Sequence, residues 1–144
     1  MGMEFMKKFK PKTNVLKEFN YWIVVIREKQ VTLGDAVIIL KRNIPSLAEM
    51  TPEEASEFPI VVKWYEEKIQ SLYPAEKFNY VAAMMKDNFV HFHAFPRYSK
   101  AIMWYGISWV DEAWPKVIKF KDVEIPKDVL DSIRADIRAN ADEK

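Results

Sequence analysis

The two histidines of this 144-residue chain, His91 and His93, are separated by a single phenylalanine. Residues two apart on a β-strand point to the same face, so Phe89, His91, His93 and Phe95 are predicted to share one side of a strand. A neutral imidazole nitrogen can attack phosphorus when the other ring N–H is held by an acceptor such as a backbone carbonyl. A second imidazole on that face can donate a hydrogen bond to a phosphoryl oxygen. The pair therefore fits nucleophilic catalysis at phosphorus.

The same pair could instead have one of two different roles. Both histidines could be polar residues on the solvent face of an edge hairpin, or histidines packed beside an aromatic cluster. They could also be two ligands of a zinc or iron site. The chain has no cysteine and no third histidine, so only a carboxylate such as Asp87 or Asp111 could complete such a site.

The strand that carries the histidines must belong to a sheet. Apolar and β-branched runs predict strands over residues 21–26 and 37–39. Two further runs, 78–85 and 89–95, are separated only by the turn-type residues 86–88. This arrangement predicts a β-hairpin with a short turn.

Two helices are expected beside the sheet. Thr51 can cap a helix, and Glu54 sits three residues on to close a capping box. Pro59 lies within the apolar stripe that follows and predicts a kink or short break. A C-terminal amphipathic helix is expected over residues 126–141, whereas residues 1–12 are expected to be loose. The predicted fold class is α+β, a mainly antiparallel sheet of about five strands with a long kinked helix and a C-terminal helix.

The composition favours one folded domain over residues 1–144. Hydrophobic residues make up 49% of the chain and charged residues 30%, a balance that is not typical of disorder. The 22 Lys and Arg against 21 Asp and Glu give a net charge of +1, which argues against non-specific nucleic-acid binding.

Other features of the sequence concern location and assembly. The longest apolar runs, 21–26 and 36–40, are too short to span a membrane, and no signal peptide is recognisable. A cytoplasmic protein with no membrane partner is therefore expected. Aromatic residues make up 14% of the chain, which suits a ligand pocket or the buried interface of a homodimer.

A known family resembles part of this chain. The run VHFHAFPRY, Val90 to Tyr98, resembles the active-site strand of histidine triad (HIT) nucleotide hydrolases and transferases, whose signature is His-x-His-x-His, two apolar residues and often Pro-Arg. Alignment on the Pro-Arg pair puts His91 at the second histidine, the nucleophile of the family, and His93 at the third. The segment LGDAVIILKRNIPSLAEMTPEE, residues 33–54, is similar to the family's glycine turn, strand and helix start. The chain beyond Lys100 matches no part of the family.

The resemblance implies a nucleotide hydrolase or nucleotidyl transferase acting on nucleoside phosphate conjugates or dinucleoside polyphosphates. His91 would attack the α-phosphorus and form a nucleotidyl-histidine intermediate, and His93 would hydrogen-bond a phosphoryl oxygen. The expected partner is a small nucleotide, with no metal or other cofactor. This chemistry requires His91 to face a cleft. The candidate substrate contacts are Asn79, Lys86 and Asn88.

The chain also departs from the family pattern. Phe89 stands at the first histidine, the segment before the strand is short, and Asp35 stands where several members have a histidine. These departures leave open a second interpretation, a nucleotide-binding module with weak or lost turnover. Arg97 is interpreted as a partner for a carboxylate at the strand end rather than as a phosphate ligand.

Overall fold

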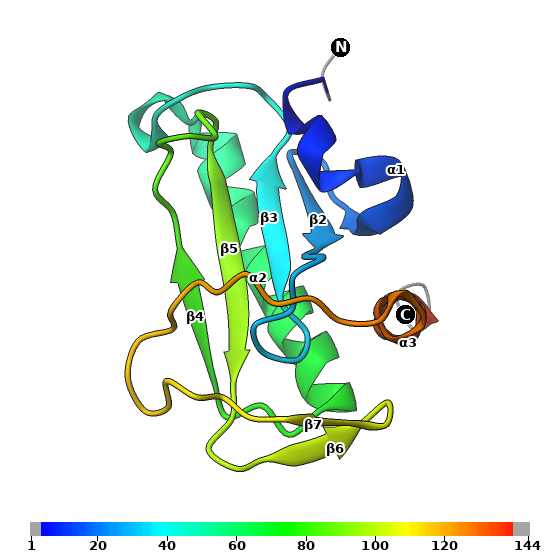
Figure 1. The fold of residues 1–144 in the computed structure, drawn as a ribbon. Coiled ribbons are helices and arrows are strands. Elements are labelled where there is room, and N and C mark those ends of the chain that lie inside the picture. The colour runs from blue at the N-terminus through cyan, green and yellow to red at the C-terminus, as the bar shows by residue number, and fades with distance from the viewer. Residues whose placement is uncertain (1–3, 140–144) are drawn as a thin grey trace.

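The computed structural model of the chain describes residues 4–139. Its centre is a five-stranded antiparallel sheet with the strand order β1-β2-β3-β5-β4 (Figure 1). The α+β class and the strand number expected from the sequence are confirmed. The strands are β1 (Val15–Glu18), β2 (Trp22–Ile26), β3 (Ala36–Leu40), β4 (Lys77–Val81) and β5 (His91–Arg97).

The long helix α2 (Pro52–Leu72) lies behind the sheet in Figure 1. Its predicted capping box is present, since the Thr51 hydroxyl accepts from the Glu54 amide at 3.1 Å and the Glu54 carboxylate accepts from the Thr51 amide at 2.9 Å. Of the kink or short break expected near Pro59, the break is absent, because α2 runs through Pro59 as one helix. Pro59 removes a donor to the carbonyl of Ala55, but both residues are exposed, so water can pair with that carbonyl.

The two faces of the sheet have different neighbours. Alternate residues of β2 and β3 pack against α2 in the main core, around Tyr65 and Ile69. On the opposite face lies a smaller cluster. It contains Ile23, Val25, Val37, Ile39 and Phe89. Because His91 pairs with Ile39 and His93 with Val37 across the sheet, both histidines lie on this second face, here called the histidine face.

The connection between β4 and β5 is longer than the predicted turn over residues 86–88. β4 ends at Val81 and β5 begins at His91, so residues 82–90 form the loop. The difference arises because Val90 pairs elsewhere: its carbonyl accepts from the Leu40 amide at 3.1 Å, and its amide donates to the Ile44 carbonyl at 3.0 Å. These bonds hold the end of the loop beside β3 rather than β4.

The N-terminal segment covers part of the histidine face. It forms a 3₁₀ helix, η1 (Glu4–Phe9), and one turn of helix, α1 (Pro11–Asn14), before β1. Residues 4–12 are therefore not loose as expected, because Met6 is fully buried against the sheet. Residues 1–3 lie outside the described residues.

The C-terminal part of the chain completes this covering layer. A two-stranded hairpin, β6 (Ile102–Trp104) and β7 (Ile107–Trp109), follows β5. Residues 110–126, here called the strap, then cross in front of β5 and β3 (Figure 1).

A second 3₁₀ helix, η2 (Leu47–Glu49), lies in the loop before α2.

The predicted C-terminal helix is observed as α3 (Lys127–Ala139). The predicted end at residues 140–141 lies outside the described residues. Arg134 of α3 donates to the Asn14 side chain at 3.0 Å, and Arg138 donates to the Val15 carbonyl at 2.7 Å, so α3 fastens the N-terminal segment. None of the helices in residues 4–139 is long and apolar enough to cross a lipid bilayer.

Candidate active site

His91 and His93 lie next to each other on β5, as their spacing predicted. The ring centroids are 5.1 Å apart, and Phe89 and Phe95 continue the same row at 4.8 Å from His91 and 6.3 Å from His93. The pleat of the strand produces this row, because alternate side chains of β5 face the same side. Both imidazoles are thus presented to one space on the histidine face.

The His91 ring is fixed by the backbone. Its Nδ1 lies 2.7 Å from the carbonyl oxygen of Phe89, so Nδ1 carries the proton and donates it to that carbonyl. The lone pair is then on Nε2, the nitrogen that a nucleophile needs. The acceptor is a main-chain oxygen, so replacement of the first triad histidine by Phe89 does not remove this bond.

His93 is a neutral imidazole. Burial lowers its pKa to about 4, and the positive charge of Arg27 contributes to the lowering. Its Nδ1 is buried and has no hydrogen-bond partner among the described residues. A neutral ring has one N–H to donate, which suits a hydrogen bond to a phosphoryl oxygen better than a general-acid role near pH 7.

Arg27 is a cation of this face that was not expected from the sequence. Its guanidinium carbon lies 5.4 Å from the Phe95 ring centroid and 5.2 Å from that of Phe120 on the strap. Arg27 continues the row of Ile23 and Val25 just beyond the end of β2. The alternation along 23, 25 and 27 was the signal that could have placed it on the histidine face.

Asp35 is a fully buried carboxyl at the start of β3. It accepts hydrogen bonds from the Thr32 amide at 3.0 Å and the Thr32 hydroxyl at 2.6 Å. Burial raises its pKa to about 7, although the Thr32 hydrogen bonds and the charge of Arg27 favour the ionised form.

Asp35 and His93 are expected to give opposite pH dependences of stability. Asp35, with its pKa raised from 3.8 to about 7, binds more proton in the folded state, so it lowers stability as pH rises through that window. The effect is on the order of 4 kcal/mol. His93, with its pKa lowered from 6.5 to about 4, binds more proton in the unfolded state, so it raises stability as pH rises from about 4 to 6.5.

Urea unfolding between pH 4 and pH 8 separates the two. Relative to the wild-type profile, Asp35→Asn should gain stability with rising pH, because the Asp35 contribution, which falls over this range, is removed. His93→Gln should lose stability over the same range. Groups common to all three proteins cancel in these differences, so variant profiles parallel to the wild type would contradict the assignment.

The histidines are covered by two aromatic side chains. The Phe9 ring lies 6.0 Å from His91 and 6.4 Å from His93, and the Phe120 ring lies 4.9 Å from His93. His91 is only 4% exposed. The expectation that His91 faces a cleft is therefore not met, because the ring packs among Phe9, Phe89 and His93.

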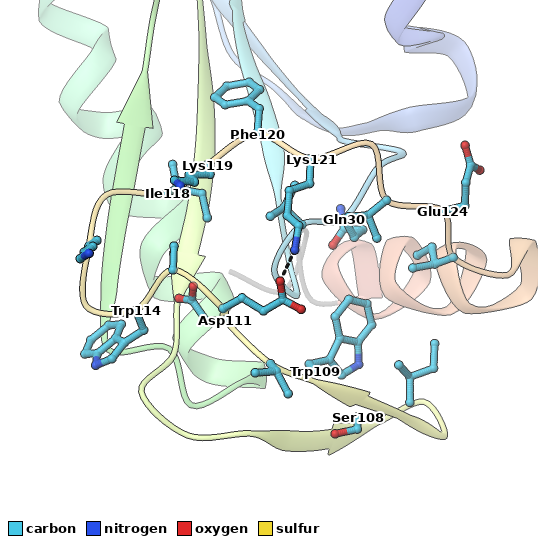
Figure 2. Close-up of a pocket in the computed structure, with 18 of the residues that line it drawn as sticks. Gln30, Ser108, Trp109, Asp111, Trp114, Ile118, Lys119, Phe120, Lys121 and Glu124 are labelled. Atoms are coloured by element: carbon cyan, nitrogen blue, oxygen red, sulfur yellow. Dashed lines mark hydrogen bonds and ion pairs between the residues drawn. The ribbon is translucent and has the colours of Figure 1, made fainter.

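Two cavities lie beside this cover. One of about 870 Å³ is bounded by the strap and β7, and Figure 2 shows Trp109 and Gln30 reaching into it. Phe120 lines this cavity and also contacts His93. The second, of about 620 Å³, lies under the N-terminal segment and reaches Ile23. Neither histidine lines either cavity.

The predicted substrate contacts lie on β4 and on the loop before β5. Asn79 lies on the histidine face of β4, but its side-chain oxygen accepts from Arg97 at 2.7 Å and from the Ile118 amide at 3.1 Å. It therefore holds the strap. Lys86 and Asn88 lie on the loop of residues 82–90 that leads into β5.

Arg97 has the structural role expected from the sequence. It is buried and makes a two-pronged ion pair with Asp111, at 2.7 Å and 3.0 Å. Asp87, the other carboxylate considered for a metal site, pairs with Lys8 at 2.9 Å. Within residues 4–139 no group of three or more His, Cys, Asp or Glu side chains is placed to hold a metal ion.

Comparison with known proteins relates this site to a fold. No protein family matches the sequence, and no curated protein matches it either. The structure is similar to a hypothetical histidine triad nucleotide-binding protein from Sulfolobus tokodaii, at 18% identity and a TM-score of 0.65, over 92% of this chain and 89% of that one. It is also similar to the diadenosine triphosphate hydrolase of Plasmodium falciparum, at 14% identity and a TM-score of 0.66, over 92% and 79%.

A third similar structure is the NitFhit protein of C. elegans, at 18% identity and a TM-score of 0.63. The match covers 88% of this chain but only 27% of that longer one. Each of the three similarities covers most of this chain. The chain has the fold of the histidine triad proteins.

Proposed function

We propose that this chain binds nucleoside phosphates on the histidine face and cleaves them through a nucleotidyl-His91 intermediate. The Nε2 lone pair of His91 attacks the α-phosphorus, forming an N–P bond as the bond to the leaving group breaks. The leaving group departs with that electron pair and takes a proton from solvent. Water then attacks the phosphorus, the N–P bond breaks, and a nucleoside monophosphate leaves.

The observation that carries this proposal is the 2.7 Å contact between His91 Nδ1 and the Phe89 carbonyl. It fixes the tautomer, and it stabilises the positive charge that the ring acquires when Nε2 bonds to phosphorus. The names of two similar structures, a nucleotide-binding protein and a diadenosine triphosphate hydrolase, support the substrate class.

Other groups on this face have proposed supporting roles. Neutral His93 donates its N–H to a phosphoryl oxygen, and Arg27, the nearby cation, offsets phosphate charge. Lys86 and Asn88 contact the outer phosphates from their loop. Asn79 is left to hold the strap, because its oxygen already has two donors.

A second candidate is a nucleotide-binding module without turnover. It is favoured by the cover over His91, which is only 4% exposed beneath Phe9. Such a module binds a nucleoside monophosphate but forms no covalent adduct.

Trapping the intermediate distinguishes the two. Excess protein is mixed with diadenosine triphosphate, denatured at alkaline pH, where phosphoramidates survive, and digested for mass spectrometry. The proposal expects an adenylyl adduct on the His91 peptide and none on His91→Asn protein. Calorimetric binding of AMP with neither adduct nor turnover would select the second candidate.

A further inference from the structure

The apolar floor beside the histidines is occupied by the chain itself. Ile23 of β2, Ile39 of β3 and His91 of β5 stand in one row across the sheet, and Val25, Val37 and His93 form the next row. The four aliphatic side chains form a flat surface leading directly to the imidazoles. Met6 is fully buried in the cluster that these residues form.

Phe9, from the same short segment, covers the histidines. Its ring lies 6.1 Å from Phe89, in addition to its contacts with both imidazoles. Met6 and Phe9 are three residues apart, so one turn of η1 carries both side chains to the sheet. Together they contact the apolar floor and both imidazoles.

The segment contacts the sheet through the apolar side chains of Met6 and Phe9, and Lys10 lies 3.4 Å from the exposed Glu28 carboxylate. The backbone hydrogen bonds from the amides of Lys10, Thr13 and Asn14 all end within the segment itself. η1 is kinked at Met6, which has φ −111° and ψ 21°. The Lys8 ion pair to Asp87 is exposed on the lysine side, and exposed pairs contribute little.

We propose that residues 4–12, here called the plug, close the nucleotide site and must leave it before a nucleotide binds. The inference rests on the function proposed above. A nucleobase, like the buried Met6 side chain, would remove the apolar floor from water, so the two compete for it. The plug pivots at its tied end, where Asn14 donates to the Phe9 carbonyl and to Glu28, both at 3.0 Å.

The alternative is that residues 4–12 form a permanent wall of the nucleotide site. The two arrangements predict opposite effects of AMP on proteolysis of this segment. Wild-type protein is treated with a limiting amount of trypsin, with and without saturating AMP, and cuts after Lys8 and Lys12 are followed by mass spectrometry. Cleavage of a locally opened segment tracks its open population, so AMP should speed these cuts by about tenfold or more if it displaces the plug. Protection by AMP would overturn the inference.

A variant test measures the competition directly. In Met6→Gln/Phe9→Gln the plug loses both apolar contacts, so AMP should bind about tenfold more tightly than to the wild type. Met103→Gln is the matched control, because this methionine is 67% exposed on β6, and it should bind AMP as the wild type does. Equal or weaker AMP binding by the double variant would contradict the plug.

A readout that needs no nucleotide separates failure of the plug from failure of the proposed function. Diethyl pyrocarbonate modifies imidazole, and the chain has only two histidines to report. The double variant should react about tenfold faster than the wild type if the plug covers them. If the double variant reacts no faster than the wild type, the plug is disproved whatever the enzymatic activity. If it reacts faster but does not bind AMP, the proposed nucleotide-binding function is disproved, and with it the competition between the plug and AMP.

Discussion

Replacing His91 with asparagine is expected to lower kcat/KM for diadenosine polyphosphates by at least about 10³-fold, because the nucleophile is lost. Asparagine keeps an N–H that can donate to the Phe89 carbonyl, which now accepts from Nδ1 at 2.7 Å. It has no lone pair able to attack phosphorus. Nucleotide binding should survive, so the loss should fall on kcat, measured by release of AMP.

His93→Asn is the matched control on the same strand face. His93 is proposed to donate one hydrogen bond to a phosphoryl oxygen, and loss of one such donor typically costs on the order of 10²-fold. The loss should therefore be smaller than that of His91→Asn. A His91→Asn protein that binds AMP and retains turnover within about tenfold of the wild type would disprove the nucleophile assignment.

Replacing Arg97 with leucine is expected to destabilise the fold by about 3–5 kcal/mol, because it leaves a buried carboxylate without its partner. The Arg97 and Asp111 side chains are 3% and 2% exposed. Arg97 also donates to Asn79, which in turn accepts from the strap at Ile118. Urea unfolding at pH 7 measures the loss.

Two further variants show whether the buried charge is the cause. The double replacement of Arg97 and Asp111 by leucine should cost less than Arg97→Leu alone, because no unpaired charge remains. Glu112 and Lys121 form an ion pair within the strap, but both side chains are exposed. Lys121→Ala should therefore change stability by less than about 1 kcal/mol. Equal losses for the buried and exposed pairs would refute the role assigned to the buried charge.

The elements that the sequence predicted correctly are those set by neighbouring residues. The capping box of Thr51 and Glu54 is encoded within four positions, and the shared face of His91 and His93 follows from strand geometry alone. The hydrogen bond from His91 to a backbone carbonyl was also expected, although the sequence did not identify Phe89 as the acceptor, since a nucleophilic imidazole needs such an acceptor.

The features that the sequence did not reveal depend on distant contacts. The strap is held by the Asp111 ion pair with Arg97 and by the hydrogen bond from the Ile118 amide to Asn79. No local sequence pattern predicts either contact. The plug was hidden because lysines follow Met6 and give the segment a polar appearance. Quaternary structure and cellular location stay predictions, which light scattering and fractionation can test.

The fastening of the N-terminal segment by α3 has a consequence for synthesis. The sheet is complete once Arg97 has left the ribosome, but Arg134 and Arg138, which hold Asn14 and Val15, emerge only later. A nascent chain therefore contains both histidines and the apolar strands beside them before it contains α3, the helix that binds its N-terminal segment. Until translation reaches residue 138, the first strand is held by its pairing with β2 and by the burial of Leu16 in the main core, without the bonds from α3.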